Sequence, residues 1–169
     1  MVVVLASGCA TAGSSMYADR AALNRFGGTD ISVDTVSVTL DYVPQRDIAS
    51  QMAAFARSSL GRVVRAAAEG GDIAAGAEHA AVGSIEVNQR SFLVGIDPVN
   101  SIFVSLTATD GEGTVLFRVT RYRVGKDTLL SAAVQRDLIR EITGPVRGIL
   151  SRNGIQRGNK PPQRESDDP

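Results

Sequence analysis

The sequence predicts an α+β domain with a mixed sheet of about four strands and two long helices on one face. Four segments alternate apolar and polar residues, as half-buried strands do, and two long segments repeat apolar residues every three or four positions, as amphipathic helices do. Their order along the chain is strand, helix, three strands, helix. Two helices can cover one face of such a sheet. We expect the first strand to lie parallel to a later one, because a helix connects them.

The first predicted elements are a short helix at 16–26, ended by two glycines, and a strand at 31–43. Val36, Val38, Leu40 and Tyr42 alternate with polar residues in this strand. Ile31 and Val33 are in the opposite register, which predicts a bulge near residues 34–35. Pro44 is expected to end the strand, because proline has no N–H to donate to a neighbouring strand.

A first long helix is predicted at 45–69, where Gly70 and Gly71 end it. Residues 72–80 are rich in glycine and alanine, which predicts a loop. The apolar face of the helix is expected to contain Ile48, Met52, Phe55, Ala56, Ser59, Val63 and Ala67.

Three strands are predicted next, at 81–94, 101–109 and 114–124, with a turn at 95–100. The sequence Asp-Gly-Glu-Gly at 110–113 is a strong hairpin signal between the second and third of these strands.

The last predicted helix covers 127–152, with Asp127 as its N-cap and a kink at Pro145. A single domain is therefore expected at 30–153. Residues 154–169 are polar and contain three prolines, which predicts a disordered tail.

Composition excludes several classes of protein. The chain has 169 residues, which suits one domain, and its 18 basic and 18 acidic residues cancel. A protein without a basic excess is not expected to bind nucleic acid, because phosphate contacts need cations. One cysteine cannot form an intramolecular disulfide.

Residues for catalysis are scarce. His79 is the only histidine, and it follows Glu78 in the segment rich in glycine and alanine. With one histidine and one cysteine, a zinc site of the usual ligands is not expected. The paired glycines match neither a phosphate-binding loop nor a dinucleotide fingerprint. The sequence therefore predicts a protein that is not an enzyme and needs no cofactor or metal.

Basic residues cluster on the fourth strand and at its end. Arg118, Arg121, Arg123 and Lys126 lie there, and Arg90 is on a neighbouring strand. Such a cluster can bind phosphate or carboxylate groups of a partner. The alternative is a solvated strand edge, where basic residues prevent aggregation.

The N-terminal residues predict a location. Residues 1–5 are apolar, Ala6, Ser7 and Gly8 are small, and Cys9 follows. Residues 5–9 resemble the lipobox of bacterial lipoproteins. In that family a signal peptide is removed, here residues 1–8, and the cysteine is lipidated and acylated.

The lipobox resemblance implies that Cys9 anchors the chain in a membrane, with 9–29 as tether and lead-in. Ala10 follows the cysteine where family members kept in the inner membrane often have Asp, which implies an outer-membrane protein facing the periplasm. The alternative is a short buried strand that ends in a core cysteine.

The predicted layout resembles small envelope lipoproteins, above all the lipopolysaccharide-assembly type, over residues 31–152. Activators of peptidoglycan synthases and lipoproteins of lipid-transport systems resemble it almost as well. These resemblances imply a non-catalytic accessory or assembly factor that binds a larger envelope complex. Two alternatives stay open, namely a ligand-binding periplasmic module and a soluble cytoplasmic α+β protein whose N-terminus only mimics a lipobox.

Overall fold

The computed structural model describes residues 11–28, 30–60 and 80–157. The elements are, in order, β1 (Thr11–Ala18), α1 (Arg20–Phe26), β2 (Asp30–Leu40), β3 (Val43–Pro44), α2 (Arg46–Leu60), β4 (Ala80–Val94), β5 (Asp97–Thr109), β6 (Val115–Gly125) and α3 (Ala132–Arg157). One mixed sheet has the strand order β1-β6-β5-β4-β2-β3. The predicted α+β class is confirmed, but the described part has six strands where about four were expected; its three helices are the two long ones and a short one near the N-terminus.

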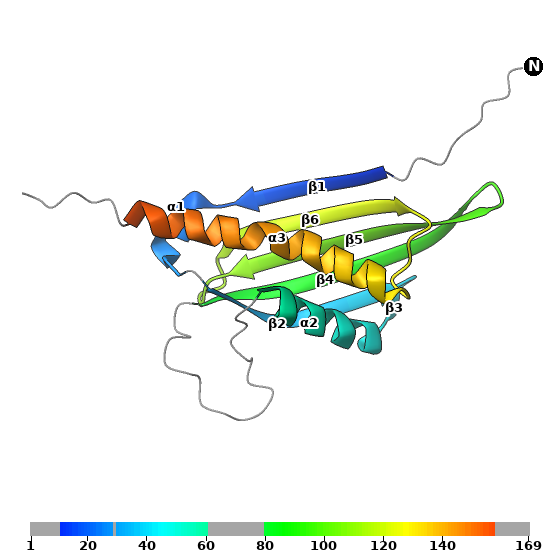
Figure 1. Ribbon diagram of the computed structural model, residues 1–169, viewed down its shortest axis with the longest axis horizontal. Coiled ribbons are helices and arrows are strands. Elements are labelled where there is room, and N and C mark those ends of the chain that lie inside the picture. Colours follow the sequence, from blue (N-terminus) through cyan, green and yellow to red (C-terminus); the bar gives the residue numbers. More distant parts are fainter. Residues whose placement is uncertain (1–10, 29, 61–79, 158–169) are drawn as a thin grey trace, which may run out of the picture.

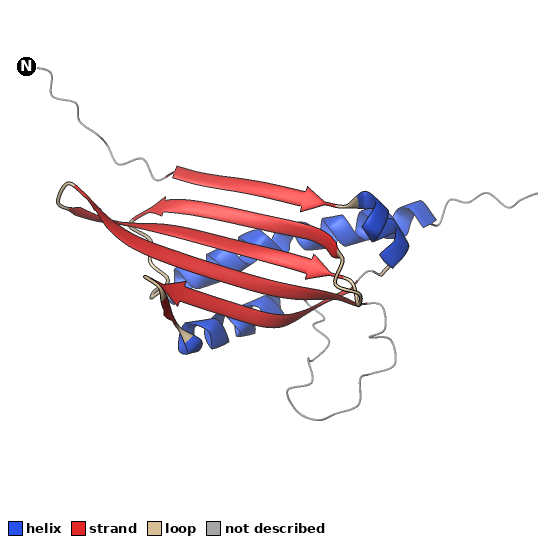
Figure 2. Ribbon diagram, turned by 180° about the vertical axis from the view of Figure 1, so that it is seen from behind, coloured by secondary structure: helices blue, strands red, loops and turns tan. Residues whose placement is uncertain are grey.

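The long helices α2 and α3 cover one face of the sheet and pack against each other (Figure 1). Seen from behind, the sheet lies in front of the helices (Figure 2). The core lies between these two layers. Its largest fully buried side chains are Phe117, Met52, Ile85, Ile102, Leu106, Leu116, Leu129, Leu138, Ile139, Ile142, Gln135 and Val87.

The parallel pairing predicted for the first strand is confirmed, because β2 lies parallel to β4. The predicted bulge is also confirmed, since the pairing register shifts between Val33 and Thr35. The shift turns both apolar sets of β2 toward the helices, so that Ile31, Val33 and Val38 are all buried.

The prediction that Pro44 ends the long strand is wrong in detail. The strand ends at Leu40, and Asp41 and Tyr42 turn the chain with positive φ angles of 45° and 73°. Two successive positive φ angles are characteristic of a type I′ hairpin turn. Pro44 then pairs with Thr39 in β3, at the edge of the sheet, where a missing N–H is tolerated.

The predicted tether is the largest correction. Residues 11–18 form β1, which pairs antiparallel with β6 along its whole length, from Thr11 opposite Val124 to Ala18 opposite Phe117. The predicted helix at 16–26 is shorter than expected, because α1 begins only at Arg20, with Asp19 as its N-cap. The sheet therefore begins about 20 residues earlier than the predicted domain boundary at residue 30.

Both predicted hairpins between the later strands are present. Asp110 closes the β5–β6 turn, since its Oδ1 accepts the N–H of Thr114 at 2.8 Å and that of Glu112 at 3.0 Å. These donors, Thr114 first, hold the pKa of Asp110 below its ordinary value. The β4–β5 turn is tighter than the predicted 95–100, because Val94 already pairs with Asp97.

The last helix starts later than predicted. It begins at Ala132, so Asp127 is not its N-cap, and Asp127 instead pairs with Arg123. The helix continues through Pro145 to Arg157, past the predicted end at residue 152. The predicted tail beyond residue 157, the predicted helix beyond Leu60 and the predicted loop before Ala80 lie outside the described residues.

Candidate functional site

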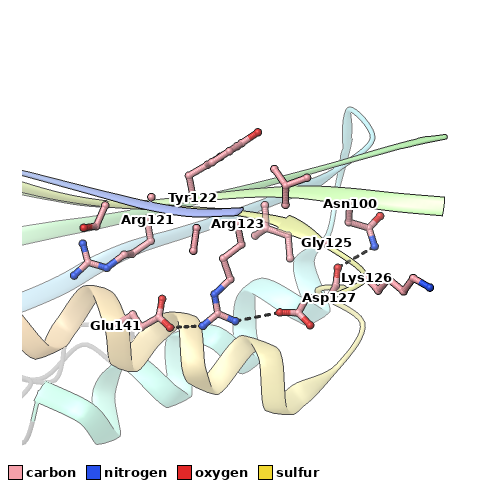
Figure 3. Close-up of a pocket in the computed structure, with 13 residues that line it drawn as sticks. Asn100, Arg121, Tyr122, Arg123, Gly125, Lys126, Asp127 and Glu141 are labelled. Carbon is pink, nitrogen blue, oxygen red and sulfur yellow. Dashed lines mark hydrogen bonds and ion pairs between the residues drawn. The ribbon is translucent and has the colours of Figure 1, made fainter. Parts of the chain in front are cut away.

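An open cavity of about 500 Å³ lies between β1, the end of β6 and α3, on the helix-covered face of the sheet (Figure 3). Its β1 wall consists of small residues, because Ala12 and Ser14 lie directly opposite Arg123 and Arg121 of β6. Large side chains at these two positions would fill the space. The cavity therefore exists because the edge strand has small side chains where β6 has arginines.

Arg123 is the central charged group of this cavity. Its guanidinium forms ion pairs with Glu141 of α3 and, at 3.2 Å, with Asp127. Partial burial disfavours the charged form of Arg123, but Glu141 and Asp127 outweigh it and raise the pKa of Arg123 above its ordinary value. The arginine therefore ties the end of β6 to α3, and its charge is already compensated within the chain.

The other two cations of the cavity do not converge with Arg123. Arg121 donates a hydrogen bond from Nη1 to the carbonyl oxygen of Thr120 at 3.1 Å. Figure 3 shows Arg121 and Lys126 pointing away from Arg123 toward opposite sides. A small-molecule site usually directs several polar groups at one volume. These diverging side chains favour contact with a partner surface over an enclosed ligand.

The predicted basic cluster is divided between the two faces of the sheet. Arg121 and Arg123 are on the helix-covered face, whereas Arg118 is on the opposite face, where its Nε donates to Thr107 Oγ1 at 3.1 Å. Arg90 is also on the opposite face, and its guanidinium lies 3.1 Å from the centroid of the Tyr42 ring. This division could have been predicted from the sequence, because successive side chains of a strand point to opposite faces. Arg118 is an odd number of residues from Arg121 and Arg123, so it lies on the other face.

The edge of β1 is a second candidate surface, which the sequence analysis missed. This strand pairs with β6 on one side, and no described element lies along its other side. Its eight residues, TAGSSMYA, include no charge and no proline, and Met16 is 59% exposed. Charges, prolines and short length are the usual means of protecting an edge strand from pairing with another chain.

Two residues singled out from the sequence, Cys9 and His79, lie outside the described residues. Within the described ranges, no group of three or more histidine, cysteine, aspartate or glutamate side chains is placed to hold a metal ion. A search of the same ranges also finds no helix that is long and apolar enough to cross a membrane.

No protein-family model matches the chain, and no curated protein matches it in sequence. Among solved structures, the chain resembles the PelC dodecamer from Paraburkholderia phytofirmans with 20% identity and a TM-score of 0.50. The match covers 81% of this chain and 98% of that one. A variant of the same PelC dodecamer matches over the same shares with 18% identity and a TM-score of 0.45. The chain is therefore a small α+β protein with the fold of PelC. The layout resemblance to lipopolysaccharide-assembly lipoproteins stays a prediction.

Proposed function

We propose that the protein is a non-catalytic, lipid-anchored accessory subunit of a cell-envelope complex, and that it acts as an assembly of several copies. The observation that carries this proposal is the unprotected edge of β1, which presents unpaired backbone groups along an uncharged strand. The PelC structure that shares its fold is a dodecamer, which supports assembly of this chain with copies of itself.

The cavity beside this edge supports a docking role. Arg123 is already paired with two carboxylates, and Arg121 and Lys126 diverge, so the polar groups do not form a constellation of nucleophile, base and stabilising donors. Arg121, on β6 next to the edge strand, is available for a carboxylate of a partner. The proposal therefore assigns the cavity to the same contact surface as the β1 edge.

The edge is tested by the oligomeric state of the purified protein. We expect Met16→Lys to convert a defined oligomer into monomers, because a lysine on an edge strand must be desolvated when a second strand pairs there. Sedimentation velocity measures the change. The matched control is Val43→Lys, which places the same charge at a residue of similar exposure, 57%, on the opposite edge of the sheet.

Two results would contradict assembly through this edge. One is a parent protein that stays monomeric across the accessible concentration range. The other is a Met16→Lys variant that assembles as the parent and the Val43→Lys control do.

The anchor is tested separately. We expect cells that express the protein with its complete leader to incorporate labelled palmitate, and the Cys9→Ser variant to incorporate none, because the cysteine thiol is the group that a lipid donor alkylates. The membrane fraction should hold the parent after washing at high salt, since several acyl chains bind firmly. Equal labelling of both proteins, or labelling of neither, would reject lipidation at Cys9.

A further inference from the structure

One end of the sheet collects exposed apolar side chains from three separate connections. They come from the β2–β3 turn, the β4–β5 hairpin and the segment between β6 and α3. Seven of the eleven exposed large hydrophobic residues in the described part of the chain lie here: Tyr42, Val43, Phe92, Leu93, Val94, Ile96 and Leu130. We call this set the apolar end. Scattered exposed apolar residues are ordinary, but a cluster of this kind marks a contact surface.

The β4–β5 hairpin is the most prominent part of the apolar end. Pairing with β6 stops at Asn100 opposite Gly125, so beyond this point β5 pairs only with β4. Three further residue pairs and the turn extend the hairpin by roughly 10–15 Å, at about 3.3 Å per residue. Figure 1 shows it projecting past the other strands.

The turn of this hairpin and its β4 arm are apolar. Phe92, Leu93 and Val94 are followed by Gly95, whose φ of 65° allows the tight turn, and by Ile96, which is 95% exposed. Asp97 is the first charged residue after this run, and it pairs with Val94 at the rung next to the turn. A half-buried strand would alternate apolar and polar residues, so this consecutive run has no explanation in the sheet itself.

The start of β1 lies at the same end of the molecule. Thr11 pairs with Val124, and Val124 pairs with Ser101, one residue from the last rung that β5 shares with β6. Figure 1 shows the start of β1 and the hairpin tip on the same side. Cys9 precedes Thr11 by two residues, a chain length of at most about 7 Å. An anchor on Cys9 would therefore hold this end against the membrane.

We propose that the hairpin tip inserts into the membrane surface to which the N-terminus is anchored. This second membrane contact would be independent of the lipid anchor on Cys9. The orientation rests on the proposed function, but the insertion itself does not. A depth of about 5–10 Å reaches the boundary between headgroups and acyl chains. A tilted hairpin would immerse Ile96 and the β4 arm, while Asp97, which lies on the β5 arm opposite Val94, stays in the headgroup layer.

A second copy of the chain is a poorer occupant than lipid. A projecting tip needs an apolar recess to receive it, and the described cavity of suitable size is lined by Arg121, Arg123, Asp127 and Glu141. A lipid surface requires no matching shape. Tyr42, stacked under Arg90 beside the hairpin, adds a ring of the kind that is enriched at membrane interfaces.

The chain lacks tryptophan, which allows a direct test of insertion. In full-length protein that carries Cys9→Ser, Ile96→Trp would introduce the only tryptophan. With vesicles of phosphatidylethanolamine and phosphatidylglycerol that have brominated acyl chains, we expect its emission to shift to the blue and to be quenched. The matched control is Tyr17→Trp at the opposite end of β1, which should stay unquenched.

A second variant measures the strength of the contact. Leu93→Asp combined with Ile96→Asp, in the same Cys9→Ser background, should reduce vesicle cosedimentation by about tenfold for each side chain. Unquenched Ile96→Trp, or cosedimentation unchanged by the two aspartates, would overturn the proposal. A blue-shifted emission of Ile96→Trp without vesicles, together with a larger species in sedimentation that the two aspartates abolish, would identify a second copy as the occupant and also overturn it.

These measurements separate the two proposals. Because Cys9→Ser cannot be lipidated, quenching of Ile96→Trp supports insertion whether or not the parent incorporates palmitate. Palmitate labelling of the parent without quenching of Ile96→Trp would leave the anchor intact and reject insertion of the tip.

Discussion

Replacement of Phe117 by alanine is expected to lower the free energy of unfolding by about 3–5 kcal/mol. Phe117 is the largest fully buried side chain of the described core. It lies on β6 and pairs with Ala108 of β5 on one side and Ala18 of β1 on the other, so both of its neighbours on that rung have small side chains. In the variant, three alanines would stand in a row across three strands, and no neighbouring side chain on that rung could fill the cavity.

The matched control for this deletion is Phe103→Ala. Phe103 is on β5 but on the face without helices, and it is 38% exposed, so the same deletion removes less buried surface. Urea unfolding followed by far-ultraviolet circular dichroism measures both variants. Because a typical domain is stable by about 5–15 kcal/mol, Phe117→Ala should leave a marginal fold. Equal unfolding midpoints for the two variants would contradict this account of the core.

Replacement of Gln89 by leucine is expected to cost about 1–3 kcal/mol, although leucine is apolar and the site is buried. Gln89 Oε1 accepts the backbone N–H of Leu129 at 2.7 Å, and Gln135 Nε2 donates to the carbonyl oxygen of Leu129 at 2.8 Å. Two buried glutamines, one from β4 and one from α3, thus hold both backbone groups of one residue. Leucine at position 89 would leave the buried N–H of Leu129 without an acceptor.

Asn88→Leu is the control for this substitution, because Asn88 is next to Gln89 on β4 but bonds only to Glu86 on the exposed face. We expect it to change stability little. A double-mutant cycle with Gln135→Leu should show coupling, since both glutamines bind the same residue. If Gln89→Leu unfolds at the same urea concentration as Asn88→Leu, the glutamines do not hold Leu129 in this way.

Elements with one buried face were predictable from the sequence. In β2 the change in apolar register predicted the bulge between Val33 and Thr35. In the β5–β6 hairpin the sequence at Asp110 predicted the turn. Burial of one face imposes the alternation that makes such strands visible in a sequence.

The strand β1 could not be predicted in the same way. Its side chains on both faces are exposed, and Ala12, Gly13 and Ser14 are as typical of a linker as of a strand. It is a strand because it pairs with the edge of β6, which lies about 100 residues further along the chain. Local composition contains no trace of such a distant partner.

The candidate surfaces were predictable only in part. The cluster of arginines on β6 is evident in the sequence, but their division between two faces depends on the alternation of side chains along the strand. The pairing of Arg123 with Glu141 depends on where α3 lies, which the sequence does not show. The apolar tip was assigned to a strand and a turn, although the unbroken run from Phe92 to Val94 departs from alternation. Asp127 matches the sequence pattern of a helix N-cap. A short acidic residue before a helical segment looks the same in a sequence whether it caps the helix or pairs with an arginine.

The pairing of β1 with β6 has a consequence for the order in which the chain folds. Hairpins form quickly because their strands are adjacent in sequence, whereas strands that are far apart must first close a long loop. The strand β1 therefore stays unpaired until the last strand of the sheet, which begins at Val115, is available. Until then, an uncharged strand with no partner is exposed to other chains. Correct folding of this protein therefore depends on keeping β1 apart from other copies until β6 is available to pair with it.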